Sequence, residues 1–287
     1  MGVITTEQIK ELRDKTGVSV MQCKKALEET NGNMDEALMV LRKVSGEMAS
    51  KKADRTANEG SISISINGDK AVMVILHSET DFVAQNADFL KVAQDIADMA
   101  LAEGKEQATA KASSLVEPLV LKIGENIQLG EILDIQGGVL GGYTHHNRKA
   151  GAIVSLSGGT EALAKDIAMH IAAMNPQYVK ADEIPAEAVE KSTQFFMKEV
   201  EETAGDKPEE MKKKILDGKV QNYLKEQTLN EQPFFKNPDM TVGQYAAKEG
   251  ASVVSFIRYK IIAQHASFTS HPYNFVPYHP NIFGIQG

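Results

Sequence analysis

The sequence predicts an α+β fold, in which helices and strands are grouped along the chain instead of alternating regularly. Three observations favour this class. Residues 1–56 and 186–228 carry apolar side chains at helical spacing, whereas residues 61–78 alternate as a β-hairpin does. After residue 78, strand and helix patterns follow one another without the regular succession of a doubly wound sheet.

The first 56 residues are expected to form three short helices. Two capping boxes, Thr5–Gln8 and Ser19–Gln22, predict the starts of the first two helices. Apolar residues at helical spacing predict a third helix over residues 34–44. Three helices of this size can form a compact bundle. The lysine-rich residues 50–60 are then expected to be a linker.

A hairpin is expected to open the core. SISISI (61–66) alternates strictly, which places isoleucine on one face and serine on the other. Asn67-Gly68 is a strong two-residue turn signal. The chain returns as AVMVILHS (71–78), which is more apolar and therefore more central in its sheet. Residues 87–104 then have the period of an amphipathic helix.

Further patterns complete the chain. We expect strands at 118–135 and 142–159, a helix at 161–175 and a closing strand at 251–262. Residues 186–228 hold two charged amphipathic helices around a Gly/Pro turn, which predicts an antiparallel helical hairpin. Prolines in the uncharged tail, 263–287, predict an irregular segment.

Composition disfavours several function classes. The formal net charge of −8 argues against a broad nucleic-acid surface, because such a surface needs clustered lysine and arginine. No apolar run reaches the ~18 residues of a membrane span, so no membrane association is expected. Neither a dinucleotide glycine motif nor a Walker lysine is present, so we expect no direct nucleotide binding and no cofactor. With one cysteine, Cys23, the chain is expected in a reducing cytoplasm.

The candidates for catalysis are few. Cys23 is expected to be a buried, small apolar residue, as free cysteines usually are. His145 and His146 are adjacent, and adjacent side chains on a strand point to opposite faces. No metal-ligand motif accompanies them, so no metal site and no enzyme are expected. An enzyme that uses these residues, and a helical adaptor built on the N-terminal helices, remain as alternatives.

The stretch ETDFVAQNADF (79–89) raises a question about Phe82. This aromatic residue follows a buried strand, at the point where the chain emerges. One interpretation makes Asp81 a helix N-cap and folds Phe82 into the core of this chain. The other presents both side chains to another protein. The residues alone favour neither interpretation.

Several motifs together resemble the elongation factor Ts family, the guanine-nucleotide exchange factors of bacterial-type elongation factor Tu. The resemblance covers residues 4 to about 260. The motifs are IKELRDKTG (9–17), MQCKKAL (21–27), TDFVAQNADF (80–89), KIGENI (122–127), GYTH (142–145), KDIAMHIAAMNPQYV (165–179), LNEQPFFKNPDMTVGQ (229–244) and ASVVSFIRYK (251–260).

The resemblance implies a domain organisation. It consists of an N-terminal three-helix domain like ubiquitin-associated domains, a two-part α+β core and a protruding antiparallel helical hairpin. The implied bounds are 1–56 for the N-terminal domain, 57–140 for the first core part, 141–185 with 229–262 for the second, 186–228 for the hairpin and 263–287 for a tail without a family counterpart.

The resemblance also implies a function and a site. A member of the family binds the GTPase elongation factor Tu in its GDP form, promotes GDP release by disturbing the magnesium and phosphate site, and leaves when GTP binds. The residues implied beside the magnesium site are Thr80, Asp81, Phe82 and Val83. The other implied contacts are Arg13, Val20, Met21, Lys24, Ile123, Gly124 and His145.

Three residues, at two places in the chain, depart from the family pattern. Gln22 stands where an aspartate is usual, which keeps the capping function but loses a charge near the helix N-terminus. Leu129-Gly130 replace an arginine pair that is often present.

Overall fold

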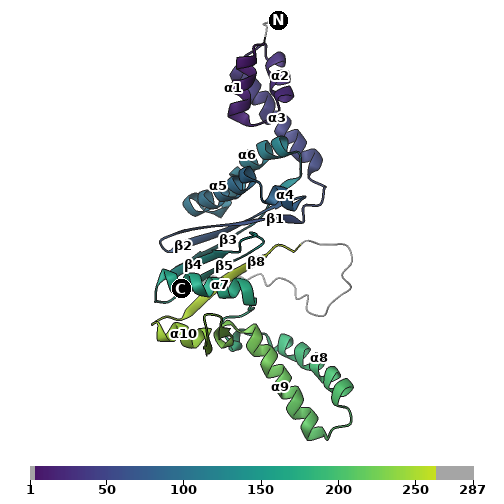
Figure 1. Cartoon of the computed structure of the whole chain (residues 1–287), viewed down its shortest axis with the longest axis vertical. Helices are drawn as coiled ribbons and strands as arrows, with labels where there is room; N and C mark the ends of the chain where they lie inside the picture. The colour runs from purple at the N-terminus through teal and green to yellow at the C-terminus, as the bar shows by residue number, and fades with distance from the viewer. Residues whose placement is uncertain (1–3, 263–287) are drawn as a thin grey trace. The chain divides into compact units, whose positions relative to one another are not determined.

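The computed structural model describes residues 4–262, and these form a mixed α+β fold (Figure 1). The expected tail, 263–287, lies outside the described residues. The contacts between residues divide the chain into two units. The first unit joins the chain up to Ala173 with Glu249–Ile262, and the second is Met174–Lys248. The candidate site lies in the first unit.

The N-terminal helices are α1 (Thr6–Thr16), α2 (Val20–Glu29) and α3 (Met34–Lys52). Both predicted capping boxes are confirmed: Thr5 and Ser19 cap α1 and α2, with Gln8 and Gln22 as their partners. Gly17 ends α1 with a positive φ of 67°, which a residue with a Cβ rarely adopts. Local sequence therefore accounts for where these helices begin and where α1 ends.

Helix α3 is longer than the sequence predicts. It continues to Lys52, so the first residues of the expected linker are helical. Its second half contacts α6 (Lys105–Ile123) of the core. Leu121 of α6 is one of the buried residues of the N-terminal bundle, which also include Leu12, Val18, Cys23, Ala26, Leu27, Ala37 and Leu41. The bundle therefore completes its hydrophobic core with a residue of the following sheet-and-helix layer.

The first sheet has the order β1 (Glu59–Asn67), β2 (Lys70–Ser78), β3 (Ile127–Gln136), and both pairs are antiparallel. The predicted hairpin turns at Asn67, which pairs with Lys70. Both faces of β1 are covered. Ser61 Oγ donates a hydrogen bond to the carbonyl of Ala84 at 2.5 Å on the helix side, whereas Ile62 packs in the core on the other side.

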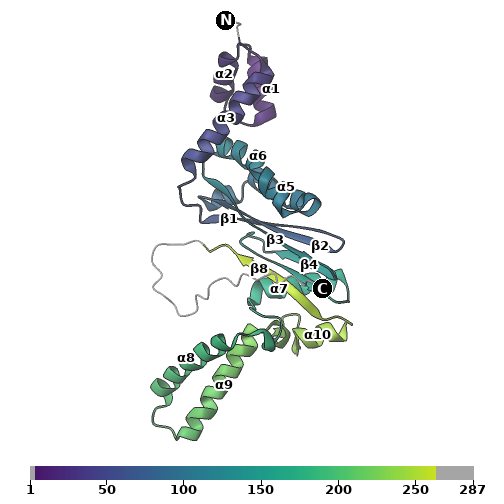
Figure 2. The same cartoon turned by 180° about the vertical axis from the view of Figure 1, so that it is seen from behind.

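Helices α5 (Ala87–Glu103) and α6 cover the serine face of this sheet (Figure 2). The prediction of a strand over residues 118–123 was wrong, because α6 continues through Pro118. Its buried residues Ala108, Ala112, Val116, Leu119 and Val120 keep a helical spacing across the proline. Their burial outweighs the one hydrogen bond that the proline nitrogen cannot donate.

The second sheet has the order β4 (Val139–Thr144), β5 (Ala150–Leu156), β8 (Val253–Lys260), again antiparallel. It packs on the isoleucine face of the first sheet. A Cβ on Gly142 would lie 3.0 Å from Ile64 Cγ2, so the missing side chain lets the sheets approach closely. Helix α7 (Glu161–Met174) covers the far face, with its backbone against Gly141.

The second unit contains the predicted helical hairpin. Its elements are η1 (Ala181–Glu183), α8 (Ala186–Ala204), α9 (Glu209–Gln227), η2 (Leu229–Glu231), β6 (Pro233–Phe234), β7 (Asn237–Thr241) and α10 (Val242–Lys248). The rings of Phe196 and Tyr223 join α8 to α9, with centroids 5.7 Å apart. Lys219 also donates to Glu199 at 2.8 Å across the pair.

Candidate protein-interaction site

Phe82 lies on the surface of the protein. It is 85% exposed, more than any other large apolar side chain in the described part of the chain. The interpretation that folds this ring into the core of the chain is therefore wrong. Leaving a phenylalanine in water forgoes about 1.5–3 kcal/mol of burial free energy, which a protein partner can supply. Asp81, beside it, is also exposed.

The short helix α4 (Asp81–Ala84) carries both residues. Thr80 caps this helix, not Asp81 as the alternative interpretation proposed: Thr80 Oγ1 accepts a hydrogen bond from the Val83 N–H at 3.4 Å. Val83 and Ala84 are buried against the first sheet. One face of α4 is therefore anchored, and its other face presents Asp81 and Phe82 to solvent.

Ile123 and Gly124 lie at the end of α6. Gly124 closes the helix with a φ of 88°, and its N–H donates to the carbonyl of Val120 at 2.8 Å. The carbonyl of Gly124 accepts a hydrogen bond from Lys52 at the end of α3. Gly124 is exposed and Ile123 half-buried, so both can be reached from solvent.

Two acidic residues connect the α4 segment to the end of α6. The N–H of Asn126 donates to Glu79 at 2.6 Å, and the N–H of Thr80 donates to Glu125 at 3.1 Å. The structure therefore brings the Asp81–Phe82 pair and the Ile123–Gly124 pair to the same end of the first sheet. Sequence reasoning missed Glu79 and Glu125 as site residues, although Glu79 directly precedes Thr80 and Glu125 lies within the KIGENI motif (122–127).

His145 lies in the turn after β4. Its Nδ1 is 3.1 Å from the hydroxyl of Tyr143, and its ring centroid is 4.2 Å from that of His146. The two imidazoles lie close together because the chain has already left the strand. Lys149 of the same turn forms an ion pair with Glu59 at 2.5 Å, and Glu59 pairs with Ser78 at the end of β2. This turn is thus tied to the strand end that precedes α4.

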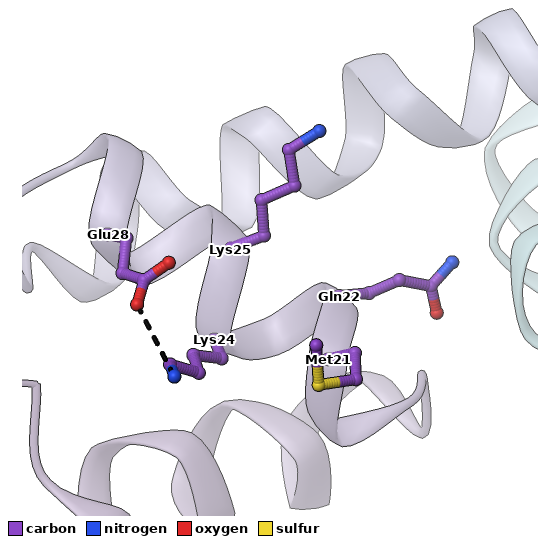
Figure 3. A pocket seen from close by; sticks show the side chains of 5 residues that line it. All are labelled: Met21, Gln22, Lys24, Lys25 and Glu28. Atoms are coloured by element: carbon purple, nitrogen blue, oxygen red, sulfur yellow. Dashed lines mark ion pairs between the residues drawn. The ribbon is translucent and has the colours of Figure 1, made fainter.

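The N-terminal candidates form a separate surface on α1 and α2. Met21 is 73% exposed and Val20 47% exposed, next to the capping residue Ser19. Lys24 forms a 3.6 Å ion pair with Glu28. An open hollow of about 350 Å³ lies here, lined by Met21, Gln22, Lys24, Lys25 and Glu28 (Figure 3).

Arg13, the fourth N-terminal candidate, is exposed in the last turn of α1. It contributes a positive charge to the bundle's surface, so the N-terminal surface combines apolar and charged side chains, as protein interfaces do.

Cys23, one of the candidates for catalysis, is not exposed for covalent chemistry. Cys23 is buried in the N-terminal bundle, and burial raises the pKa of its thiol. A thiol with a raised pKa is a poor nucleophile near neutral pH, because the thiolate is the reactive form. His170, a further histidine of the core, is buried within α7. Among residues 4–262, no three His, Cys, Asp or Glu side chains come together as metal ligands.

No helix within the described residues combines the length and the apolar character needed to cross a bilayer.

The family comparison matches most of the core and all of the second unit. The family model described as Elongation factor TS aligns with residues 79–262, which is more than half of the chain. The chain belongs to the elongation factor Ts family. This match begins at Glu79, and it includes the Asp81–Phe82 pair, the Ile123–Gly124 pair and His145.

Relatives named Elongation factor Ts extend the similarity over most of the chain. The one from Cellvibrio japonicus (strain Ueda107) is 43% identical over 267 residues, which cover 91% of this chain and 91% of the relative. The one from Legionella pneumophila (strain Lens) is 40% identical over 274 residues, which cover 91% and 93%. This member of the elongation factor Ts family is a translation elongation factor, with an exchange-factor role in protein biosynthesis.

Proposed function

We propose that this chain binds elongation factor Tu in its GDP form, promotes GDP release by disturbing the magnesium and phosphate site, and leaves when GTP binds. The observation that carries the proposal is the solvent exposure of the Phe82 ring. The ring is almost fully exposed on a helix whose opposite face is buried, so it is available to enter another protein. The Asp81 carboxylate beside it carries the charge that would disturb a magnesium site.

The mechanism requires no covalent chemistry. A GTPase holds its nucleotide through phosphate contacts and a bridging Mg²⁺. An exchange factor stabilises the conformation in which those contacts are broken. Linkage then makes the effect reciprocal: the factor weakens nucleotide binding by the same ratio as the nucleotide weakens binding of the factor. Incoming GTP can therefore displace the factor, and the chain acts as an exchange factor without being an enzyme in the covalent sense.

Phe82 cannot supply the whole effect. A thousandfold acceleration of release lowers the barrier by about 4 kcal/mol. Burying one phenylalanine contributes only about 1.5–3 kcal/mol. The proposed site therefore also includes Thr80 and Asp81 beside the ring, and Val83, which is buried in the core of this chain and holds α4 from beneath. The other proposed contacts are Arg13, Val20, Met21, Lys24, Ile123, Gly124 and His145. Each of these residues is exposed or half-buried, which supports this role.

The proposal extends to the organisation of the chain. We assign residues 1–56 to a domain like ubiquitin-associated domains, supported by the three packed helices α1 to α3. The two sheets support a two-part core, with the helical hairpin of residues 186–228 as an insertion. We place the division at residue 140, one residue after the second sheet begins at Val139. As a translation factor, the chain works in the cytoplasm.

A release assay tests this function. Elongation factor Tu loaded with a fluorescent GDP is mixed with the chain and an excess of unlabelled GDP, and the decay of fluorescence is followed. The expected result is a release rate that rises with the concentration of the chain and then saturates. Binding without faster release would favour the helical-adaptor alternative over exchange. If the chain neither binds elongation factor Tu nor accelerates GDP release, the proposal is wrong.

A further inference from the structure

Two carboxylates extend the pairing of β2 and β3 beyond the ends of the strands. The last backbone pair on this side is Ser78 with Ile127. In the same register, the next opposed residues are Glu79 with Asn126 and Thr80 with Glu125. In each of these pairs, the side-chain carboxylate of one residue accepts a hydrogen bond from the backbone N–H of the other.

The Glu125 carboxylate binds Thr80 twice. Its Oε2 accepts the Thr80 N–H at 3.1 Å, and its Oε1 accepts the Thr80 hydroxyl at 2.8 Å. A threonine hydroxyl has one hydrogen and two lone pairs, whereas an ionised carboxylate can only accept. The hydroxyl hydrogen therefore points to Glu125. A lone pair of the same oxygen remains for the Val83 N–H, which it accepts as the N-cap of α4.

Helix α4 depends on such contacts. It has four residues, and a helix of one turn is unstable by itself because nucleation fixes several backbone angles for a single hydrogen bond. Its C-terminal half is held by the burial of Val83 and Ala84 and by the hydrogen bond from Ser61. Its N-terminal half is held by Thr80, and Thr80 is held by Glu125. The direction of the Phe82 ring therefore depends on the carboxylate of Glu125, which lies on another segment of the chain, just after α6.

We propose that Glu125 is a positioning residue for Phe82 and Asp81, and this proposal rests on the exchange function proposed above. Glu125 accepts two hydrogen bonds from Thr80, the N-cap of α4. The exposed Phe82 ring therefore has a fixed direction before a partner binds. Ordering the ring in advance lowers the entropic cost of inserting it beside the magnesium site, which in the proposed mechanism is the step that releases GDP. Glu125 acts through Thr80, and it does not itself enter the partner.

The first experiment measures the motion of position 82 in the free protein. The chain contains no tryptophan, so Phe82→Trp introduces a single fluorophore. Time-resolved anisotropy then reports the nanosecond motion of the indole. In the full chain, Glu125→Ala is expected to increase the amplitude of this motion. Glu125→Gln, which keeps one good acceptor, is expected to give a smaller increase. Glu106→Gln, exposed in the first turn of α6, is the charge-matched control and should change nothing.

The second experiment separates positioning from a merely structural role. GDP release from elongation factor Tu is measured over a range of concentrations of the chain, with Phe82 intact. Because the lost hydrogen bonds join a charged group, Glu125→Ala is expected to lower the saturating rate by about tenfold. The concentration for half-saturation should change little, because Glu125 does not contact the partner. Glu125→Gln should restore part of the rate.

The outcomes decide between the possibilities. Unchanged indole motion in a folded Glu125→Ala chain would overturn the proposal, and so would a change in the half-saturating concentration alone. If Glu125→Ala does not fold, as judged by thermal unfolding, the same measurements on Glu125→Gln decide. If the unsubstituted chain does not accelerate release, the exchange function is wrong. The anisotropy alone then decides whether Glu125 holds position 82.

Discussion

Two phenylalanines near each other in sequence have opposite environments. Phe82 is almost fully exposed on α4, whereas Phe89 is fully buried in α5 against the first sheet. Both follow the same apolar strand, and both belong to the same short motif. The two rings differ because α4 packs on the core through Val83 and Ala84, which leaves Phe82 on its outer face. At the scale of single residues, the site therefore consists of a ring that the fold leaves out of its own core.

Replacing each ring by alanine separates the two environments. Phe82→Ala is expected to slow GDP release while changing the free energy of unfolding by less than about 0.5 kcal/mol, because the ring makes little contact with the fold. Phe89→Ala, the matched control, is expected to cost about 3–5 kcal/mol of stability. Thermal or urea unfolding of both variants, with release rates for Phe82→Ala, checks this. A large stability loss in Phe82→Ala with normal release would mean that the ring serves the core.

At the scale of elements, α6 is shared between two hydrophobic cores. Its residues Val116, Leu119 and Val120 pack with α5 and the first sheet. Leu121, the next residue, packs in the N-terminal bundle beside residues such as Leu41 of α3. Consecutive helical residues point about 100° apart, so one helix can serve cores on two sides. The bundle that carries Met21 and Lys24 is thus attached to the layer that carries Phe82.

A double-mutant cycle tests this attachment. Leu121→Ala is expected to cost about 2–5 kcal/mol of stability because it opens a cavity. Combined with Leu41→Ala, the two losses should depart from additivity by about 0.5–3 kcal/mol, as expected for residues that share a cluster. The control combines Leu121→Ala with Ile153→Ala, a residue of the core between the two sheets. That pair should be additive within about 0.5 kcal/mol. Additivity of Leu121 with Leu41 as well would contradict a shared core.

At the scale of the whole molecule, the first unit is a stack of layers: helices α5 and α6, two antiparallel sheets, and helix α7. The sheets meet where the isoleucines of β1 face glycines of the second sheet. A Cβ on Gly142 would lie 2.9 Å from Ile66 and 3.0 Å from Ile64. This contact is part of what places the His145 turn, which follows Gly142 on β4, beside the strand end that leads to α4.

A single methyl group tests the contact between the sheets. Gly142→Ala is expected to destabilise the protein by about 1–3 kcal/mol, because the added Cβ overpacks the contact between the sheets. Ile66→Val removes the closest methyl and should recover part of the loss. Gly218→Ala in α9 is the control without close packing, because a Cβ at this position would meet nothing within 4 Å. It should stabilise the protein by about 0.5–1 kcal/mol, as alanine does in a helix. Equal effects of the two alanines in urea unfolding would contradict close packing of the sheets.

Much of the fold was predictable because it depends on neighbours in sequence. A capping box needs two side chains three residues apart, so Thr5 and Ser19 could be assigned as caps from the sequence. The Asn67-Gly68 turn and the alternation of β1 are equally local. The family could be recognised from short motifs in order. For the same reason the sequence alone determined the α+β class and the hairpin of α8 with α9. The residues proposed for the site come from the family resemblance, and they remain a prediction.

Other features depend on groups far apart in the chain, and only the tertiary structure decided them. Burial at Phe82 depends on what α4 packs against, so the sequence left it open. The helix through Pro118 persists because the sheet buries its apolar face, which outweighs a local signal for a break. Leu121 is buried by helices about a hundred residues earlier in the chain. Glu125 holds Thr80 because the register of β2 and β3 brings the two opposite each other. Local patterns determine where elements begin, whereas burial and positioning come from contacts that form only when the chain is folded.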